Sequence, residues 1–374
     1  MAYTFEGYLR KDGTVGTRNY IGVVSSVVCS SVIAKEISDR FPKAIPIVHA
    51  NGCAQLGDDF QLTKNMLVGV ASNPNLHSAL LVGLGCETNQ VSGLLHSIPK
   101  TKPVKGIGIQ QMAGGENTVN RGVEIIGKWS NEVDEEKRER LPLSNLTVGI
   151  VTIDTDEDTL RKVTPVVGGL INLLIQNDAT VVMGLSETLE PAGLLLAKRT
   201  NHEEVANRLR KLGEGVERKQ WKEIKKEHST VLGFTEEEKT FAILESELTG
   251  ANPINSLLNY NEKPQSKGLH LSSATTNIVE TFSTMASSGC NIVLVVSSRG
   301  ILTGSIALPC MTISPESKSG AFDELTDYII TEESTDVQVE KLMNELIAIS
   351  SGKQTSLEKF ELGEFSIPHI GTTF

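Results

Sequence analysis

The stretch that decides the fold is YIGVVSSVVCSSVIAKEISDRF, residues 20–41, in which an apolar run leads through a small polar turn into a helical segment. A strand that is buried on both faces of a parallel sheet has such a near-continuous apolar sequence. The same order of apolar run, turn rich in Gly, Ser, Cys or Asn, and helical segment recurs along the first 140 residues. Short β-rich runs that alternate with helical segments predict crossover units and a parallel sheet.

Working outward from this stretch, the apolar runs fall into two series. The first continues at 44–54, 78–87 and 104–111, with helical segments at 31–41, 59–73 and 89–98. The second comprises 146–154, 180–188, 269–274, 290–300 and 311–315, and a last helix is predicted at 337–352. We therefore predict an α/β fold of two domains, each with a mostly parallel sheet flanked by helices in the Rossmann-like manner.

A charged stretch, KWSNEVDEEKRER at 128–140, and the breaker Pro142 separate the two series. The predicted domains are therefore 1–142 and 143–374. A long charged helical section, at about 200–248, lies inside the second domain and has few large apolar residues. We expect it on the surface or between the domains.

Composition narrows the class of protein. Of 374 residues, 39% are hydrophobic and 22% charged, which is typical of a globular chain. The formal charge of −11 disfavours nucleic acid and anionic membranes as partners, and no apolar run reaches the roughly 18 residues of a membrane span. The N-terminus lacks the apolar core of a secretory signal, and the five cysteines form no CxxC pair. We expect a cytoplasmic protein with reduced thiols.

Unusual polar residues follow each strand of the first series. Cys29, Cys53 and Cys86 come after the first three strands. His49, Asn51, Glu87, Gln110, Gly114 and Gly115 lie beside them or after the fourth strand. Because ligands of open parallel sheets bind outside the carboxyl ends of the strands, these residues form the candidate site.

Three interpretations of the thiols stay open from the residues alone. Thiolates with an imidazole could hold a soft or borderline metal such as Fe(II) or Zn(II). One cysteine could be a nucleophile whose pKa a helix N-terminus lowers. The Gly-Cys turns could also be packing beneath an anion pocket lined by backbone.

The N-terminal run at 7–20 has its own pair of interpretations. Its Asp12-Gly13 step predicts a hairpin turn. Arg10 and Arg18 would either be solvated on a structural hairpin or face the strand-end pocket, where a guanidinium can clamp a carboxylate.

Four motifs carry a family resemblance: GYLRKDGTVGTRNYIGV at 7–23, HANGC at 49–53, VGLGCE at 82–87 and IQQMAGG at 109–115. In this order they resemble the core of the altronate/galactarate dehydratase family, which also includes the sulfolactate sulfo-lyase large subunit. The resemblance implies a metal-assisted hydro-lyase acting on a sugar acid such as altronate or galactarate. The chemistry is removal of a proton α to a carboxylate and loss of the β-hydroxyl as water.

The resemblance also implies a divalent transition metal, Fe(II) or else Mn(II), a small β-rich partner subunit and a homo-oligomer. We assign candidate roles accordingly: catalysis to His49, Gln110 and Glu187; substrate binding to Arg10, Arg18, Asn51, Gly114, Gly115 and Arg299; metal binding to Cys29, Cys53, Cys86 and Glu87. A sulfo-lyase subunit, and a non-catalytic paralogue that binds an acidic metabolite or partner, are the alternatives.

The second half resembles the family only in pieces, such as Ser186-Glu187-Thr188, Glu245-Ser246 and Arg299-Gly300. Family motifs are replaced at 154–158, 233–235 and 271–274, which predicts a changed substrate or a lost activity. The acidic run Asp154–Asp158 is either a helix N-terminal cap, which we favour, or a new site for a hard cation. Cys290 begins a strand and is expected to be a packing residue.

Overall fold

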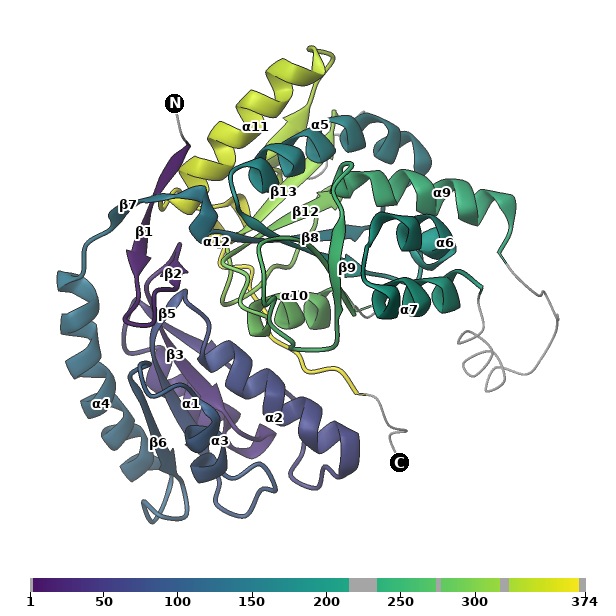
Figure 1. Cartoon of the computed structure of the whole chain (residues 1–374). Helices are drawn as coiled ribbons and strands as arrows, with labels where there is room; N and C mark the ends of the chain where they lie inside the picture. Colours follow the sequence, from purple (N-terminus) through teal and green to yellow (C-terminus); the bar gives the residue numbers. More distant parts are fainter. Residues whose placement is uncertain (1–2, 215–233, 274–276, 317–322, 370–374) are drawn as a thin grey trace.

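The computed structural model describes residues 3–214, 234–273, 277–316 and 323–369. Its first domain has a four-stranded parallel sheet in the order β4 (Ala44–Ile47), β3 (Tyr20–Ser25), β5 (Leu76–Gly83), β6 (Val104–Gly108). Helices α1 (Ser31–Ser38) and α4 (Gly115–Glu135) cover one face, and α2 (Gly57–Ala71) and α3 (Val91–Ser97) cover the other (Figure 1). The predicted α/β class is confirmed.

Burial explains why the strands were recognisable in the sequence. Seven of the eight residues of β5, LHSALLVG, are buried, as a central strand covered by helices requires. The predicted strands ran too long at their carboxyl ends, as at 44–54, because their last residues belong to the polar loops that follow β4 and its neighbours.

The second domain has a seven-stranded sheet, in which all neighbouring strands are parallel. Its order is β10 (Ile254–Leu258), β11 (Gly268–Ser273), β9 (Thr180–Leu185), β8 (Thr147–Ile153), β12 (Ile292–Ser297), β13 (Cys310–Pro315), β14 (Tyr328–Ile330). Helices α5 (Glu157–Gln176) and α11 (Thr335–Ser350) pack together on one face, and α10 (Ile278–Ser287) lies on the other (Figure 1). The two edge strands, β10 and β14, were not predicted from the sequence.

The charged section predicted at 200–248 is described only at its ends. These are α7 (Glu203–Gly213) and α9 (Glu236–Ser246), while 215–233 lie outside the described residues. Both helices bury part of their surface, through Ala206 and Leu209 of α7 and Ala242 and Glu245 of α9. They pack near α6 (Gly193–Leu196) beside β9 (Figure 1).

A third, antiparallel sheet joins the beginning of the chain to the linker between the two series. Its order is β2 (Val15–Gly16), β1 (Thr4–Leu9), β7 (Glu139–Pro142). The predicted hairpin is present, closed by Arg10 N–H donating to Thr14 O at 2.8 Å. The charged sequence of β7 did not suggest a strand. It is ordered by pairing with β1, whose Phe5 is buried in the core of the second domain.

One apolar core extends across the two predicted domains. It includes Leu62 and Met66 of α2 together with Phe282 and Met285 of α10. The two helices cross so closely that a side-chain carbon on Gly69 would lie 2.6 Å from Ser287 O, which is why glycine stands there. The two sheets are therefore held in one body. Within the described part of the chain, no helix is both long and apolar enough to cross a membrane.

Candidate active site

The structure gathers the predicted residues of the first domain at one edge of its sheet. Nine of them follow β3, β4, β5 or β6: Cys29, His49, Asn51, Cys53, Cys86, Glu87, Gln110, Gly114 and Gly115. Hydrogen bonds to backbone carbonyls join the four loops. Val28 N–H donates to Asn51 O at 2.9 Å, Thr88 Oγ1 to Cys53 O at 2.8 Å, and Gln110 N–H to Leu84 O at 3.0 Å. The loops thus form one connected surface.

Glu87 stabilises this surface by accepting hydrogen bonds from two of its loops. Its Oε1 accepts a hydrogen bond from Ser26 Oγ at 2.8 Å, and its Oε2 accepts from the backbone N–H of Gly85 and Cys86 at 2.5 and 3.0 Å. A side chain at Gly83 would place its first carbon 2.3 Å from Glu87 Oε1, so the glycine makes room for the carboxylate. Glu87 therefore ties β3 to β5 at the point where the strand order reverses.

His49 is buried and uses both ring nitrogens within the protein. Its Nδ1 accepts the N–H of Asn51 at 3.1 Å, so the proton is on Nε2, which donates to Ser25 O at 3.1 Å. Burial lowers the pKa of His49 to about 4, and the imidazole is neutral near pH 7. In this arrangement neither nitrogen is free to take a proton from a substrate, and His49 connects the β3 and β4 loops.

The three strand-end thiols of Cys29, Cys53 and Cys86 are exposed, whereas those of Cys290 and Cys310 are buried. Burial raises the pKa of both buried thiols to about 12, which fits the packing role predicted for Cys290. The predicted metal ligands do not form a metal site as placed. Over the described residues, no three His, Cys, Asp or Glu side chains come together as ligands, and both Glu87 oxygens are already engaged.

Buried amides in the same loops have unused hydrogen-bonding capacity. Asn51 Nδ2 and Asn89 Oδ1 are buried and have no hydrogen-bond partner among the described residues, and the same holds for Gln55 Nε2. The residues Asn51 and Asn89 are only 7% and 5% exposed. Buried polar atoms are normally paired, so these donors and this acceptor are suited to a ligand rich in hydroxyl groups. Gln55 and Asn89 were not among the predicted site residues, although both adjoin the cysteine motifs.

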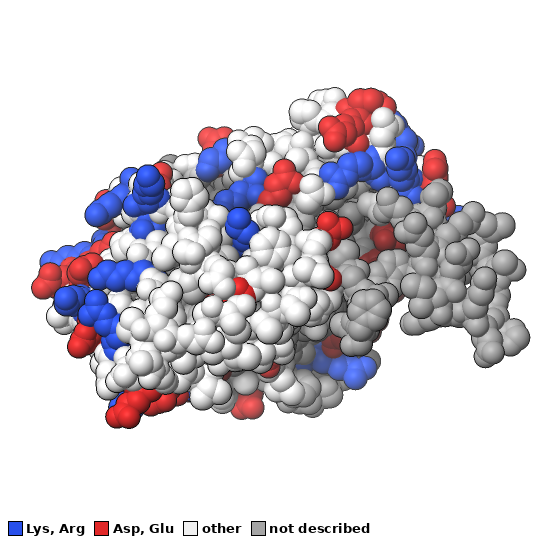
Figure 2. All heavy atoms as spheres, turned by 90° about the horizontal axis from the view of Figure 1, so that it is seen from below, with Lys and Arg blue, Asp and Glu red and all other residues white. Residues whose placement is uncertain are grey.

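The strand-end surface of the first domain has no basic residue. The segments 25–32, 49–57, 84–92 and 109–115 contain neither Lys nor Arg. Figure 2 shows the molecule from below, where the middle of the face is mostly white with a few red atoms and blue side chains gather toward its margins. A substrate carboxylate would therefore find no cationic side chain in these four loops.

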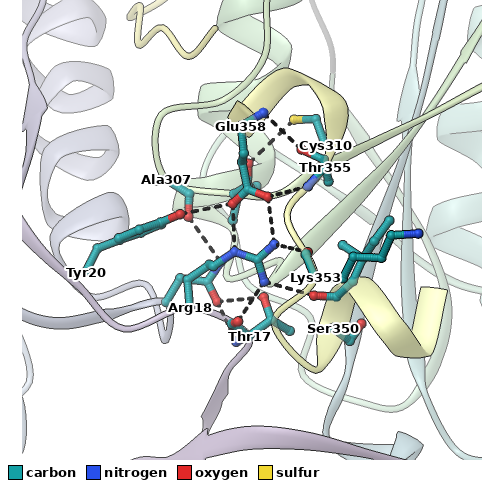
Figure 3. A network of polar contacts seen from close by, with 12 residues as sticks. Thr17, Arg18, Tyr20, Ala307, Cys310, Ser350, Lys353, Thr355 and Glu358 are labelled. Carbon is teal, nitrogen blue, oxygen red and sulfur yellow. Dashed lines mark hydrogen bonds and ion pairs between the residues drawn. The ribbon is translucent and has the colours of Figure 1, made fainter. Parts of the chain in front are cut away.

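Arg18 lies at the opposite, amino-terminal end of the same sheet. Its Nε and Nη2 each donate to a different oxygen of Glu358 at 2.7 Å, and Tyr20 Oη donates to Glu358 at 3.0 Å (Figure 3). The remaining donors bind backbone carbonyls, among them Lys353 O. Arg18 is thus neither solvated nor directed at the strand-end pocket, and this corrects both expectations. It clamps the first domain to the short helix α12 (Ser356–Lys359).

The pKa of Glu358 reflects its pairing with Arg18. Burial alone would raise the pKa of Glu358, but the hydrogen bonds and charge of Arg18 hold that pKa below its usual value. Arg10 is engaged in a similar way. It donates to Pro74 O and Asn19 Oδ1, both at 2.8 Å, and pairs with Glu136 at 3.1 Å. Both arginines stabilise the fold away from the cysteines.

In the second domain, Glu187 and Arg299 are exposed in the loops after β9 and β12. Asp154, after β8, has a left-handed backbone with φ of 46°, and its Oδ1 accepts from Ser297 Oγ at 2.7 Å. Asp156 accepts from Thr159 N–H at 2.7 Å and caps α5. The favoured interpretation of the acidic run as a helix cap is confirmed.

The fold and the strand-end site together define a class of protein. This is an α/β protein with two parallel sheets and a candidate ligand site at the strand ends of the first. The chain belongs to the D-galactarate dehydratase/altronate hydrolase family, because the model of the family's second domain matches residues 7–134 and that of its C-terminal domain matches 143–373.

Relatives extend this similarity over nearly the whole chain. An altronate dehydratase of Bacillus subtilis is 26% identical over 394 residues, covering 99% of this chain and 78% of the relative. A galactarate dehydratase (L-threo-forming) of Escherichia coli is 25% identical over 390 residues, covering 94% of this chain and 73% of the relative. A (2R)-sulfolactate sulfo-lyase subunit beta of Chromohalobacter salexigens is 28% identical over 206 residues, covering 55% and 52%. The family resemblance found in the sequence is confirmed.

Proposed function

We propose that this protein is a dehydratase of a sugar acid, with altronate and galactarate as the candidate substrates. The observation that supports this most is the similarity to named dehydratases over nearly the full chain. The two family models together account for almost all of both domains. The reaction removes the proton α to the carboxylate and expels the β-hydroxyl as water, leaving an enol that becomes a 2-keto acid.

The strand-end surface of the first domain suits the hydroxyl groups of such a substrate. Asn51 Nδ2 can donate to a hydroxyl oxygen, and Asn89 Oδ1 can accept from one. Both residues are held in place, since the Asn51 backbone bonds to His49 and to Val28, and Asn89 Nδ2 donates to Phe60 O at 3.3 Å. Satisfying a buried unpaired polar group is worth about 1–3 kcal/mol, so these amides would favour a polyhydroxylated ligand.

The carboxylate of the substrate needs a different partner. Because the four loops of the first domain contain no Lys or Arg, the exposed Arg299 after β12 is our candidate, since a guanidinium binds a carboxylate with two hydrogen bonds. The Fe(II) or Mn(II) implied by the resemblance would act as a Lewis acid, but the residues as placed do not form its site.

The test is formation of 2-keto acid from altronate, galactarate and sulfolactate, with and without added Fe(II) or Mn(II) under anaerobic conditions. We expect product from altronate or galactarate, and a drop of kcat/KM by about 10- to 100-fold in Asn51→Ala. Asn65→Ala, an exposed asparagine of α2 in the same domain, is the matched control. Sulfite released from sulfolactate alone would identify a sulfo-lyase. Binding of a sugar acid without turnover would identify a non-catalytic paralogue.

A further inference from the structure

A buried carboxyl group lies at the strand ends of the second domain. Glu245, near the end of α9, is fully buried. Its Oε1 accepts from Thr152 Oγ1 of β8 at 2.5 Å, and its Oε2 accepts from Thr188 Oγ1, just after β9, at 2.7 Å. Ser186 Oγ lies 3.5 Å from Oε1. The carboxyl group thus joins α9 to the carboxyl ends of two adjacent strands.

Within the described ranges, no charged group compensates this carboxyl group. Burial raises the pKa of Glu245, and only the hydroxyls of Thr152, Thr188 and Ser186 oppose the shift. Among the described residues, no charged group of α9, of α5 or of the short helices Glu190–Ala192 and Glu247–Thr249 that pack against α9 alters this pKa. A carboxylate without a cation is costly to bury, so burial shifts Glu245 toward its protonated form.

A short chain of hydroxyls leads from this acid to the surface. Thr188 Oγ1 is 2.7 Å from Ser186 Oγ, and Thr188 is an exposed residue at the strand ends. When Glu245 is ionised, Thr188 Oγ1 donates to it across this 2.7 Å contact; when Glu245 is protonated, its O–H donates to Thr188 Oγ1 instead. A hydroxyl can accept one hydrogen bond while it donates another, so Thr188 can then pass its own proton outward. Glu187, the candidate catalytic residue of this domain, lies between the two hydroxyl residues.

We propose that Glu245 is a positioning residue that stores the proton which Thr188 delivers to the departing β-hydroxyl of the substrate. The inference rests on the proposed dehydratase function. As the C–O bond breaks, its electron pair stays with oxygen, the Thr188 hydroxyl proton completes a water molecule, and the Glu245 proton moves to Thr188 Oγ1. Glu245 is left as a carboxylate. The α-proton taken by the base returns to it through solvent, so the cycle balances.

Two kinds of variant test the relay in the full-length protein. We expect Glu245→Gln and Thr188→Val each to lower kcat by about 100-fold or more with little change in KM, because the substrate-binding groups are untouched. Thr188→Ser keeps a hydroxyl and should retain activity. Glu247→Gln, an exposed glutamate two residues away, is the matched control. Thr188 is exposed, so its valine variant is expected to fold even if Glu245→Gln does not.

The pH profile separates a relay from a merely structural role. In the wild type, kcat should fall at high pH as Glu245 loses its proton, and this alkaline limb should disappear from the residual activity of Glu245→Gln. Infrared spectroscopy should show the carbonyl band of a protonated carboxyl group near pH 7 that is missing in the variant. An unchanged kcat in Glu245→Gln or Thr188→Val, or no such band, overturns the inference. A wild type inactive on altronate and galactarate would instead overturn the proposed function, and the relay with it.

Discussion

The strand ends of the two sheets share a hydrogen bond between a carboxylate and a serine, but they differ in the side chains around it. In the first domain, Glu87 after β5 accepts a hydrogen bond from Ser26 after β3. In the second, Asp154 after β8 accepts one from Ser297 at the end of β12. Each pair spans the point where the strand order reverses. The carboxylate-to-serine bond therefore closes the sheet edge in both domains.

The surroundings of these two bonds are opposite in character. The first surface has exposed thiols, buried amides and no Lys or Arg, and its only carboxylate is consumed by hydrogen bonds. The second has exposed Glu187 and Arg299 and the buried acid Glu245. The first surface thus offers buried amides with unused hydrogen-bonding atoms, whereas the second offers charged side chains and a buried carboxyl group.

The largest expected contrast is in thiol reactivity. With a thiol reagent such as 5,5′-dithiobis(2-nitrobenzoate), three thiols should react in the native protein and all five only after unfolding. Cys290 and Cys310 should react at least about 10³-fold more slowly than the strand-end thiols, because they need an opening of the core. Similar rates for all five would contradict the comparison. Protection of three thiols by added Fe(II) or Mn(II) would support the predicted metal.

The clamp at the amino-terminal end of the sheet should have the next largest effect. Arg18→Met leaves Glu358 buried without its cation, and we expect a loss of about 3–5 kcal/mol in the free energy of unfolding, measured in urea. Arg161→Met, which breaks an exposed pair with Glu157, should cost less than about 1 kcal/mol. Equal costs would show that the clamp does not hold the two domains together.

The clamp also predicts a direction of pH dependence. Because the pKa of Glu358 is lowered by folding, its contribution is complete above the unfolded value of about 4.3 and is lost as the pH falls through the folded pKa. Glu245 has the opposite sign, since its pKa is raised and its burial costs stability as the pH rises. Unfolding of Arg18→Met should therefore depend less on pH below about 4 than that of the wild type.

Removing the Glu87 carboxylate from the first surface should have a moderate effect on stability. Glu87→Ala leaves the N–H groups of Gly85 and Cys86 and the hydroxyl of Ser26 without their acceptor, and we expect a cost of about 2–3 kcal/mol. Glu124→Ala, at an exposed position of α4, is the control and should cost less than about 0.5 kcal/mol. Thermal unfolding measures both. A Glu87→Ala variant as stable as the control would show that the carboxylate-to-serine bond does not stabilise the first domain.

The matching bond of the second surface should show the smallest effect. Asp154→Asn keeps an oxygen acceptor and tolerates the left-handed backbone, so its cost should stay below about 0.5 kcal/mol. Asp154→Ala loses the bond and is strained at this φ, with an expected cost of about 2 kcal/mol. If the two variants prove equally stable in urea, the carboxylate-to-serine bond does not matter in this domain.

The two parallel sheets and the position of the candidate site were predictable from local patterns. Apolar runs such as 20–25 and 76–83 are covered by helices on both sides. Because both faces are buried, their sequences are rich in apolar residues. Since parallel strands end at the same edge, the loops with Cys29, Cys53 and Cys86 had to lie together. The cap formed by Asp156 was likewise visible, because a cap depends on neighbours in the sequence.

The hydrogen-bond partners of individual side chains were not predictable from the sequence. Arg18 pairs with a glutamate 340 positions away, and Glu245 accepts from Thr152 across 93 positions. Both ring nitrogens of His49 are consumed by backbone groups that a motif does not reveal. Strand β7 was missed because its charged sequence is ordered only by pairing with β1.

By itself, the sequence determined the class of fold, the family and the edge of the sheet at which the cysteines and amides gather. These follow from periodicity and from turns, which are encoded within short segments. Only the tertiary structure decided which polar groups are hydrogen-bonded within the protein and which have unused hydrogen-bonding atoms. Burial and partners far apart in the chain set that difference. They separate Glu87 and Arg18, whose polar atoms hold the protein together, from Asn51, whose buried Nδ2 has no hydrogen-bond partner among the described residues.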